Sequence, residues 1–377
     1  MDFDLGWLLL ALPVAFALGW IGSRIDLRQW KREQKGSPRA YYRGLILLLN
    51  EQPDKAIDAF IEAVQGDPDT TELHFALGNL FRRRGEFERA VRVHQHLMQR
   101  ADLSATDRER ARYALAQDYL KAGLFDRAEA AYRELAGSQF GTEARLALLQ
   151  LHERSRDWRA AADDAAQLED AGTGSFASRI AHHWCELALE ADGRGDAAQA
   201  DTALAKAREI APVSPRPWVQ AGQRLAHSGR HAEAMAAWQG LLERHPGAFA
   251  LVAQDYAKSA HAALHTGDAL ATLQALYAKQ PSLELLQAID TLDPDRHHAQ
   301  QRHEAHLRQL PTLSAAAAVL RDGPNPRPGV IQAIEQAAKP LQRYRCAACG
   351  FEAQHYFWQC PGCLSWDSYP PQRIEDQ

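Results

Sequence analysis

The stretch that decides the fold is LGNLFRRRGEFERAVRVHQHLM, residues 77–98. Small and large apolar residues stand in it at helical spacing, with Gly78 and Phe81 in a first helix, Gly85 in a turn and Ala90 in a second helix. Two antiparallel helices approach closely only where one presents a small residue to a large residue of the other. The stretch therefore predicts a helical hairpin whose remaining apolar face must be covered by a neighbouring hairpin.

The same hairpin pattern recurs along the chain. Alanines equivalent to Ala90 follow one another at spacings of 34, 38, 33, 39 and 34 residues. These alanines are Ala56, Ala90, Ala128, Ala161, Ala200 and Ala234. Two spacings equal the 34-residue period of the tetratricopeptide repeat, and the longer ones need only a few extra residues between hairpins. We therefore predict an all-α protein with a tetratricopeptide-repeat solenoid over residues 37–322, rather than a generic alanine-rich helical domain.

The sixth copy of the hairpin is the best formed. Its pattern residues are Trp218, Gly222, Leu225, Gly229, Ala234, Trp238 and Pro246. Pro68 and Pro246 are expected to end the second helices of their hairpins, because proline lacks an N–H group. After about residue 250 the pattern becomes degenerate. Helical periodicity persists from Leu251 to Leu320, but the sequence does not define the repeat boundaries there.

A solenoid of this kind presents a concave face, and such faces usually bind peptides or protein surfaces rather than perform chemistry. The sequence contains no Gly-rich phosphate loop, G-x-S-x-G elbow or dinucleotide fingerprint. The best catalytic candidates are His182 and His183 beside Cys185, and the group His297, His298, His303, Glu304 and His306. In the second group His303 and His306 are three residues apart, whereas a zincin helix needs histidines four apart. We predict that both groups are helix-surface or interhelical residues and that the chain is not an enzyme.

The composition describes a globular chain. Its 377 residues include 43 basic and 48 acidic ones, so the net charge is 43 − 48 = −5, and 46% of the residues are hydrophobic. This composition excludes disordered and collagen-like architectures. It also argues against a main role in nucleic-acid binding, which normally needs a strongly basic face. The run Arg82-Arg83-Arg84 is interpreted as solvated charge at a helix end, with an acidic-partner site as the lesser alternative.

The N-terminal segment has the pattern of a membrane anchor. From Leu5 to Ser23, 19 consecutive residues carry no charge, and about 20 apolar residues in a helix span a bilayer. A cleaved signal peptide is the alternative, but the chain opens on MDFD without a basic region. Seven basic residues against two acidic ones then form a basic flank: Arg24, Arg28, Lys31, Arg32, Lys35, Arg39 and Arg43. The positive-inside rule predicts a transmembrane anchor at residues 1–23, a basic linker at residues 24–36, an outside N-terminus and a cytoplasmic bulk.

Four cysteines near the C-terminus form a metal-binding pattern. Residues 344–371, YRCAACGFEAQHYFWQCPGCLSWDSYPP, contain the skeleton C-x2-C-x10-C-x2-C. Each C-x-x-C turn can aim two thiolates at one ion, and four thiolates leave no coordination position for water. We therefore predict one structural metal ion held by Cys346, Cys349, Cys360 and Cys363. Two disulfides or a dithiol redox motif are the alternatives, and a cytoplasmic location argues against the disulfides.

The C-terminal part divides into a linker with a short helix at residues 323–340 and a metal-binding domain at residues 341–377. This domain has more aromatic residues than it can bury: Tyr344, Phe351, Tyr356, Phe357, Trp358 and Trp366. We expect some of them to pack against the repeats, so that the domain caps the solenoid. Stacking on nucleic-acid bases is the weaker alternative, because only Arg343 and Arg345 supply nearby charge.

The order of anchor, repeat array and tetracysteine domain resembles the lipopolysaccharide assembly protein B family of Gram-negative bacteria. The resemblance is carried by YYRGLILLLNEQPDKAIDAFIEAV, by residues 77–98, by DYLKAGLFDRAEAAYREL, and above all by YRCAACGF with WQCPGCLSW. It covers nearly all of the chain and is weakest from about residue 250 to 330, where helices match but no motif does.

The resemblance implies a non-catalytic adaptor in the inner membrane with a periplasmic N-terminus. Members of the family are understood to bring the deacetylase of the committed lipid A step to a membrane-bound AAA+ metalloprotease, which restrains lipopolysaccharide output. The anchor would contact an inner-membrane protein that senses lipopolysaccharide, and the four cysteines of a rubredoxin-like domain would hold iron or zinc. A rubredoxin-like electron carrier and a generic scaffold for envelope assembly are the alternative functions.

Overall fold

The computed structural model describes residues 16, 20, 39–66, 70–323 and 326–377. The predicted anchor and linker at residues 1–36 lie outside the described residues, apart from Phe16 and Trp20, and so does Pro68. In the described ranges, no helix has the length and apolar character needed to cross a membrane.

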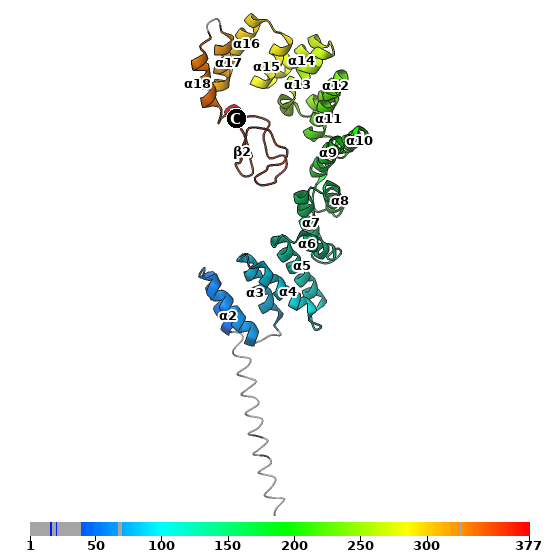
Figure 1. Cartoon of the computed structure of the whole chain (residues 1–377), viewed down its shortest axis with the longest axis vertical. Coiled ribbons are helices and arrows are strands. Elements are labelled where there is room, and N and C mark those ends of the chain that lie inside the picture. The colour runs from blue at the N-terminus through cyan, green and yellow to red at the C-terminus, as the bar shows by residue number, and fades with distance from the viewer. Residues whose placement is uncertain (1–15, 17–19, 21–38, 67–69, 324–325) are drawn as a thin grey trace, which may run out of the picture. The chain divides into compact units, whose positions relative to one another are not determined.

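Successive helices pair into hairpins, and the chain divides into two compact units, Met1–Arg154 and Ser155–Gln377 (Figure 1). In the first unit a helix at residues 39–49 is followed by α2 (Pro53–Gly66), α3 (Thr71–Arg83), α4 (Phe87–Gln99), α5 (Ala105–Lys121), α6 (Phe125–Arg133) and α7 (Gly141–Ser155). In the second unit the helices are α8 (Trp158–Asp170), α9 (Ala177–Gly193), α10 (Ala197–Ile210), α11 (Pro215–His227), α12 (His231–Arg244), η1 (Pro246–Leu251), α13 (Ala253–Ala262), α14 (Thr266–Lys279), α15 (Leu283–Leu292), α16 (Arg296–Gln309), α17 (Leu313–Asp322) and α18 (Pro328–Ala338). The predicted all-α array of hairpins is confirmed.

The phased alanines lie where the helices of each hairpin touch. All six of them, from Ala56 to Ala234, have no exposed surface. Glycine takes the same role in the partner helix: a Cβ at Gly78 would lie 2.5 Å from the ring of His94, and one at Gly222 would lie 2.2 Å from Trp238. Small residues therefore let a large ring of the second helix reach the backbone of the first, as the sequence pattern predicts.

The region after residue 250, whose repeat boundaries the sequence left undefined, consists of further hairpins. Pro246 begins the 3-10 helix η1, which separates α12 from the pair α13 and α14. Ala269 of α14 occupies the alanine position, 35 residues after Ala234, and is completely buried. The pairs α15 with α16 and α17 with α18 complete the second unit.

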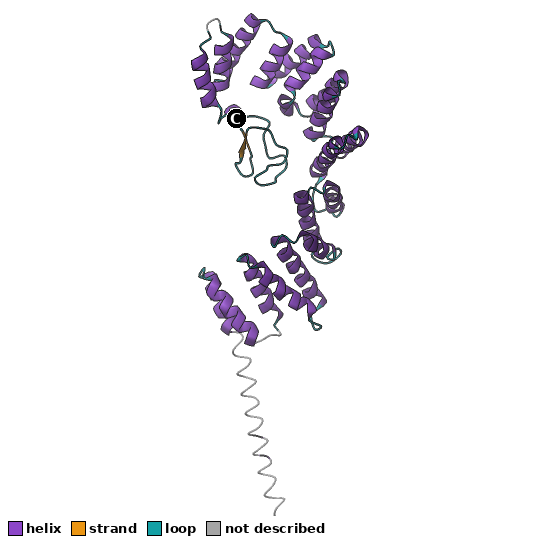
Figure 2. Ribbon diagram, viewed as in Figure 1, coloured by secondary structure: helices purple, strands orange, loops and turns teal. Residues whose placement is uncertain are grey.

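The metal-binding domain contains little regular structure, and Figure 2 draws it mainly as loop. Its strands β1 (Tyr344–Arg345) and β2 (Glu352–Ala353) are antiparallel, and the short helix η2 (Ile374–Asp376) ends the chain. The small core consists of Tyr344, Cys346, Ala353, Cys360 and Tyr369. Because two of the five are candidate metal ligands, this core depends on what the cysteines bind.

Candidate metal centre and its contacts with the repeats

Two similar turns position the four cysteines. In the first turn the Gly350 N–H donates to the carbonyl of Cys346 at 2.9 Å, and Gly350 has a φ of 77°. In the second turn the Leu364 N–H donates to the carbonyl of Cys360 at 2.8 Å, and Leu364 has a φ of 62°. Both turns thus close four residues after their first cysteine through a left-handed residue, a conformation that glycine adopts without strain.

The sulfur positions fit one tetrahedral metal ion. The Sγ atoms all lie within 4.8 Å of one another, with Cys346 and Cys363 3.8 Å apart and Cys349 and Cys360 3.7 Å apart. Four sulfurs about 2.3 Å from a central ion would be about 3.8 Å apart. A disulfide would bring two sulfurs to about 2.05 Å, and all five cysteines of the chain are free. The close approach therefore suits shared coordination and not a disulfide.

The ionisation of the thiols also favours a cation. Burial opposes ionisation of Cys346, but the Ser368 hydroxyl and the N–H groups of Cys349 and Ala348 lower the pKa of its thiol to about 6. A hydrogen bond from the Phe351 N–H favours the Cys349 thiolate, yet burial and the other three sulfurs raise its pKa to about 12. Since crowded thiolates repel one another, a bound cation is what would let all four ionise together.

The metal-binding domain packs on the repeats of the second unit through Trp366. Its indole stacks on the imidazole of His182 in α9, with ring centroids 4.7 Å apart and planes 12° apart. It meets Trp158 edge-on at 6.2 Å and His183 at 6.0 Å. Trp358 packs against the apolar core formed by α11 to α15. The expected packing of aromatic residues on the array is confirmed.

A polar contact stands beside this aromatic one. His182 Nε2 lies 2.8 Å from the Asp367 carboxylate, which also accepts a hydrogen bond from the Ser178 hydroxyl at 3.0 Å. His182 is completely buried, and this burial lowers the pKa of its imidazole despite Asp367. Burial favours the protonated form of Asp367, but His182 and Ser178 together hold its pKa below the ordinary value. Near neutral pH we therefore expect a neutral imidazole beside a carboxylate.

A buried arginine from α11 supports the same contact. Arg216 is 3% exposed, pairs with Glu186 of α9 at 2.5 Å, and places its guanidinium 5.6 Å from the Trp366 ring centroid. A guanidinium over an aromatic face is attracted by the ring, more strongly when water is excluded. Trp366 is thus held by side chains of α8, α9 and α11.

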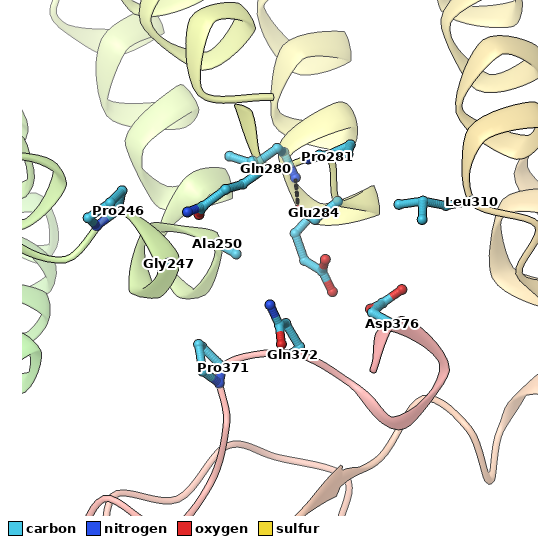
Figure 3. A pocket seen from close by; sticks show the side chains of 12 residues that line it. Pro246, Gly247, Ala250, Gln280, Pro281, Glu284, Leu310, Pro371, Gln372 and Asp376 are labelled. Carbon is cyan, nitrogen blue, oxygen red and sulfur yellow. Dashed lines mark hydrogen bonds between the residues drawn. The ribbon is translucent and has the colours of Figure 1, made fainter. Parts of the chain in front are cut away.

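The C-terminal tail makes a second set of contacts. Arg373 pairs with Glu284 of α15 at 2.9 Å, and Glu375 accepts hydrogen bonds from the hydroxyl and N–H of Ser314 at the start of α17. A small pocket lies between this tail, η1 and α15, and Figure 3 shows Glu284 and Asp376 directed into it. Burial, then Glu284 and Glu375, raise the pKa of Asp376 to about 6.

These contacts correct one expectation. The metal-binding domain does not cap the end of the array; it contacts α9, α11, α15 and α17, the inner helices of the second unit. Figure 1 shows it on the inner side of that unit's curve. The domain therefore covers much of a surface that a solenoid would otherwise offer to a ligand.

The histidines that the sequence offered as catalytic candidates are engaged in packing and polar contacts or lie at a helix start. His182 and His183 lie under the metal-binding domain, and burial raises the pKa of Cys185 to about 12. His303 lies between Asp290 at 2.8 Å and Asp322 at 2.7 Å. His306 lies 2.7 Å from the Tyr277 hydroxyl, and the exposed His297 and His298 begin α16. Across the described residues, the four cysteines are the one group with the geometry of a metal site.

The interpretation of Arg82 as solvated charge is wrong. Its guanidinium donates to the Asp118 carboxylate at 2.8 Å and to the Ala114 carbonyl, both in α5. Asp118 and His94 are completely buried and 2.5 Å apart. This polar network joins consecutive hairpins, and the sequence signal for it was Gly78, which makes room for the His94 ring.

Comparison with known proteins identifies both the repeats and the metal-binding domain. A family model described as a rubredoxin metal-binding domain matches residues 344–370, and a tetratricopeptide-repeat model matches residues 41–93. Lipopolysaccharide assembly protein B of Escherichia coli (strain K12) is 31% identical over 390 residues, covering 97% of this chain and 98% of that protein. The Haemophilus influenzae protein of the same name is 26% identical, covering 97% of both chains. Among solved structures, a tetratricopeptide repeat protein from Parabacteroides merdae is 14% identical with a TM-score of 0.35, covering 68% of this chain and 99% of that one.

Proposed function

The chain belongs to the lipopolysaccharide assembly protein B family, and on that premise we propose that it is a non-catalytic inner-membrane adaptor that lowers lipopolysaccharide synthesis. It presents the lipid A pathway deacetylase, its client, to a membrane AAA+ metalloprotease that degrades the client. The observation that carries this proposal is the full-length similarity, which includes both the repeats and the tetracysteine domain.

The repeat array supports an adaptor because hairpin solenoids bind protein surfaces. In the second unit, the inner helices α9, α11, α15 and α17 already carry the chain's own metal-binding domain. We therefore propose that the client binds the corresponding helices of the first unit, α3, α5 and α7. Tethering the array at the membrane raises the effective concentration of the client near a membrane protease.

The proposed membrane attachment rests on the sequence. Residues 1–23 would form a single-pass anchor with a periplasmic N-terminus, and the basic flank would keep the repeats on the cytoplasmic side. The same anchor would contact the inner-membrane protein that senses lipopolysaccharide. The domain boundaries predicted at residues 23, 36, 322 and 340 belong to this proposal.

Cys346, Cys349, Cys360 and Cys363 are proposed to hold one iron or zinc ion. Either metal accepts four thiolates, and sulfur ligation does not distinguish them. The ion would fold the metal-binding domain and so fix Trp366 and Asp367 against α9. These contacts with the repeats favour a structural role for the ion over rubredoxin-like electron transfer.

Depletion of the protein in cells tests the adaptor role. The half-life of the lipid A pathway deacetylase should lengthen when the chain is depleted, and restoring the chain from a plasmid should shorten it again. Depleting an unrelated single-pass inner-membrane protein is the control for membrane stress. An unchanged half-life of the deacetylase would contradict the proposal and leave a generic envelope scaffold as the better explanation.

A further inference from the structure

The helix at residues 39–49 is apolar on two sides. Its inner side, which includes Tyr41, Leu45 and Leu48, packs against the core of the first hairpins. Its outer side exposes three large apolar residues, Tyr42 (62%), Ile46 (57%) and Leu49 (84%). We refer to these three residues as the outer stripe.

The outer stripe is continuous along the helix. Its members are spaced by four and three residues, which places them within a sector of about 60° on a helix of 3.6 residues per turn. A helix on the surface of a water-soluble domain normally carries charged and polar residues in this sector. An apolar stripe on the exposed side of a helix usually marks a contact surface, so the outer stripe indicates a second surface that contacts this helix.

The basic residues beside the outer stripe and before it in the sequence indicate what covers the stripe. Arg39 precedes the outer stripe and Arg43 lies beside it, with a side chain that is 70% exposed and only loosely paired to Glu62 at 3.8 Å. The residues just before this helix add five more basic side chains between positions 24 and 38. Apolar residues bordered by Lys and Arg are typical of helices that lie in the interface of anionic bilayers. Residues 24–38 are a poor cover, because their positive charge would meet that of Arg39 and Arg43.

We propose that the outer stripe inserts into the interface of an anionic lipid bilayer, with Arg39 and Arg43 on the lipid phosphates. The inference rests on the proposed membrane anchoring and adds to it. The 15 residues between the predicted anchor and Arg39 could span as much as about 50 Å. An anchor alone would therefore not fix the distance between the repeats and the membrane surface. Lipid contact through the outer stripe fixes the first hairpin at the membrane surface, within reach of a membrane-bound partner.

Photocrosslinking in the full-length protein tests this contact. p-Benzoylphenylalanine is placed at Leu49 or, as a matched control, at Leu264, a leucine in the turn before α14 that is 89% exposed. Both proteins are reconstituted in vesicles of phosphatidylethanolamine and phosphatidylglycerol and irradiated, and the adducts are identified by mass spectrometry. We expect several-fold more lipid adduct at position 49 than at position 264, and a loss of this excess in vesicles of phosphatidylcholine alone.

A second variant separates lipid contact from anchoring. Ile46→Glu, added to the protein labelled at position 49, should reduce the lipid adduct several-fold while the protein stays with the vesicles through its anchor. Equal lipid adducts at positions 49 and 264, or crosslinks from position 49 to residues 24–38 or to a second copy, would overturn the inference while anchoring stands. Protein that does not sediment with the vesicles would overturn the anchoring proposal itself, and the lipid contact with it.

Discussion

Replacing Trp366 by alanine tests whether aromatic contacts hold the metal-binding domain on the repeats. The indole is partly buried, stacks on His182 at 4.7 Å, and meets Trp158 edge-on. Removing a fully buried tryptophan costs about 3–5 kcal/mol, so a partly buried one should cost about 2 kcal/mol. Such a loss shifts the equilibrium between the bound and released domain about 30-fold toward release.

Hydrogen exchange of the purified full-length protein measures this shift. In Trp366→Ala, amides at the start of α9, around Ser178 and His182, should exchange faster than in the wild type by up to about 30-fold. The bound metal should remain, because all four cysteines are intact. Trp366→Phe is the matched control, since a phenyl ring can still stack on the imidazole.

Two results would refute this reasoning. Exchange in α9 that is the same in Trp366→Ala and in the wild type would show that the aromatic contacts do not hold the domain. Loss of the metal in Trp366→Ala would show that the variant disrupts the domain itself rather than its contact with the repeats.

Three further predictions concern the metal site, the tail and the hairpins. Cys360→Ser should lose the bound metal and lower the melting temperature, and a melting curve unchanged by this variant and by chelator would contradict a structural metal. Since burial and Glu284 raise the pKa of Asp376 to about 6, its protonated form stabilises the tail at low pH, and this stability is lost as pH rises from about 4 to 6. Asp376→Asn should therefore raise the melting temperature at pH 7.5 and not at pH 3.5; an equal effect at both would exclude this linkage. Gly78→Ala would place a Cβ 2.5 Å from the His94 ring and should lower the free energy of unfolding of the first unit by about 1–3 kcal/mol, measured in urea. The control Gly267→Ala, whose Cβ would have no neighbour within 4 Å, should be neutral or stabilising.

The hairpins and the cysteine turns could be predicted because both arise from contacts between residues that are close together in the sequence. A buried alanine such as Ala90 recurs at nearly constant spacing, since each hairpin repeats the same close contact. The two C-x-x-C turns close within four residues and need no distant part of the chain. The repeat was hard to recognise after residue 250 because the 3-10 helix η1 stands where the first helix of the next hairpin would begin, although Ala269 keeps the alanine position.

The packing of the metal-binding domain could not be predicted in the same way. Its polar contact joins Ser178 to Asp367, 189 residues apart, and no local pattern records such a pairing. The excess of aromatic residues correctly indicated a contact with the repeats but not which helices receive it. His182 was predicted to be a helix-surface or interhelical residue, but it is buried between α9 and the metal-binding domain, where it stacks on Trp366.

Buried polar groups were the other feature that the sequence concealed. Arg82 lies in a run of three arginines that is typical of a solvated helix end, but its carboxylate partner Asp118 comes 36 residues later. The energetic reason for the pairing is that a buried carboxylate must be compensated, and the guanidinium of the preceding hairpin supplies a permanent positive charge.

The central claim, that this chain delivers a client to a membrane protease, is tested most directly by reconstitution. The full-length chain, the membrane AAA+ metalloprotease and the lipid A pathway deacetylase are combined in vesicles with ATP, and the loss of intact deacetylase is followed over time. We expect that adding the chain accelerates degradation of the deacetylase. Degradation that proceeds at the same rate with and without the chain would contradict it.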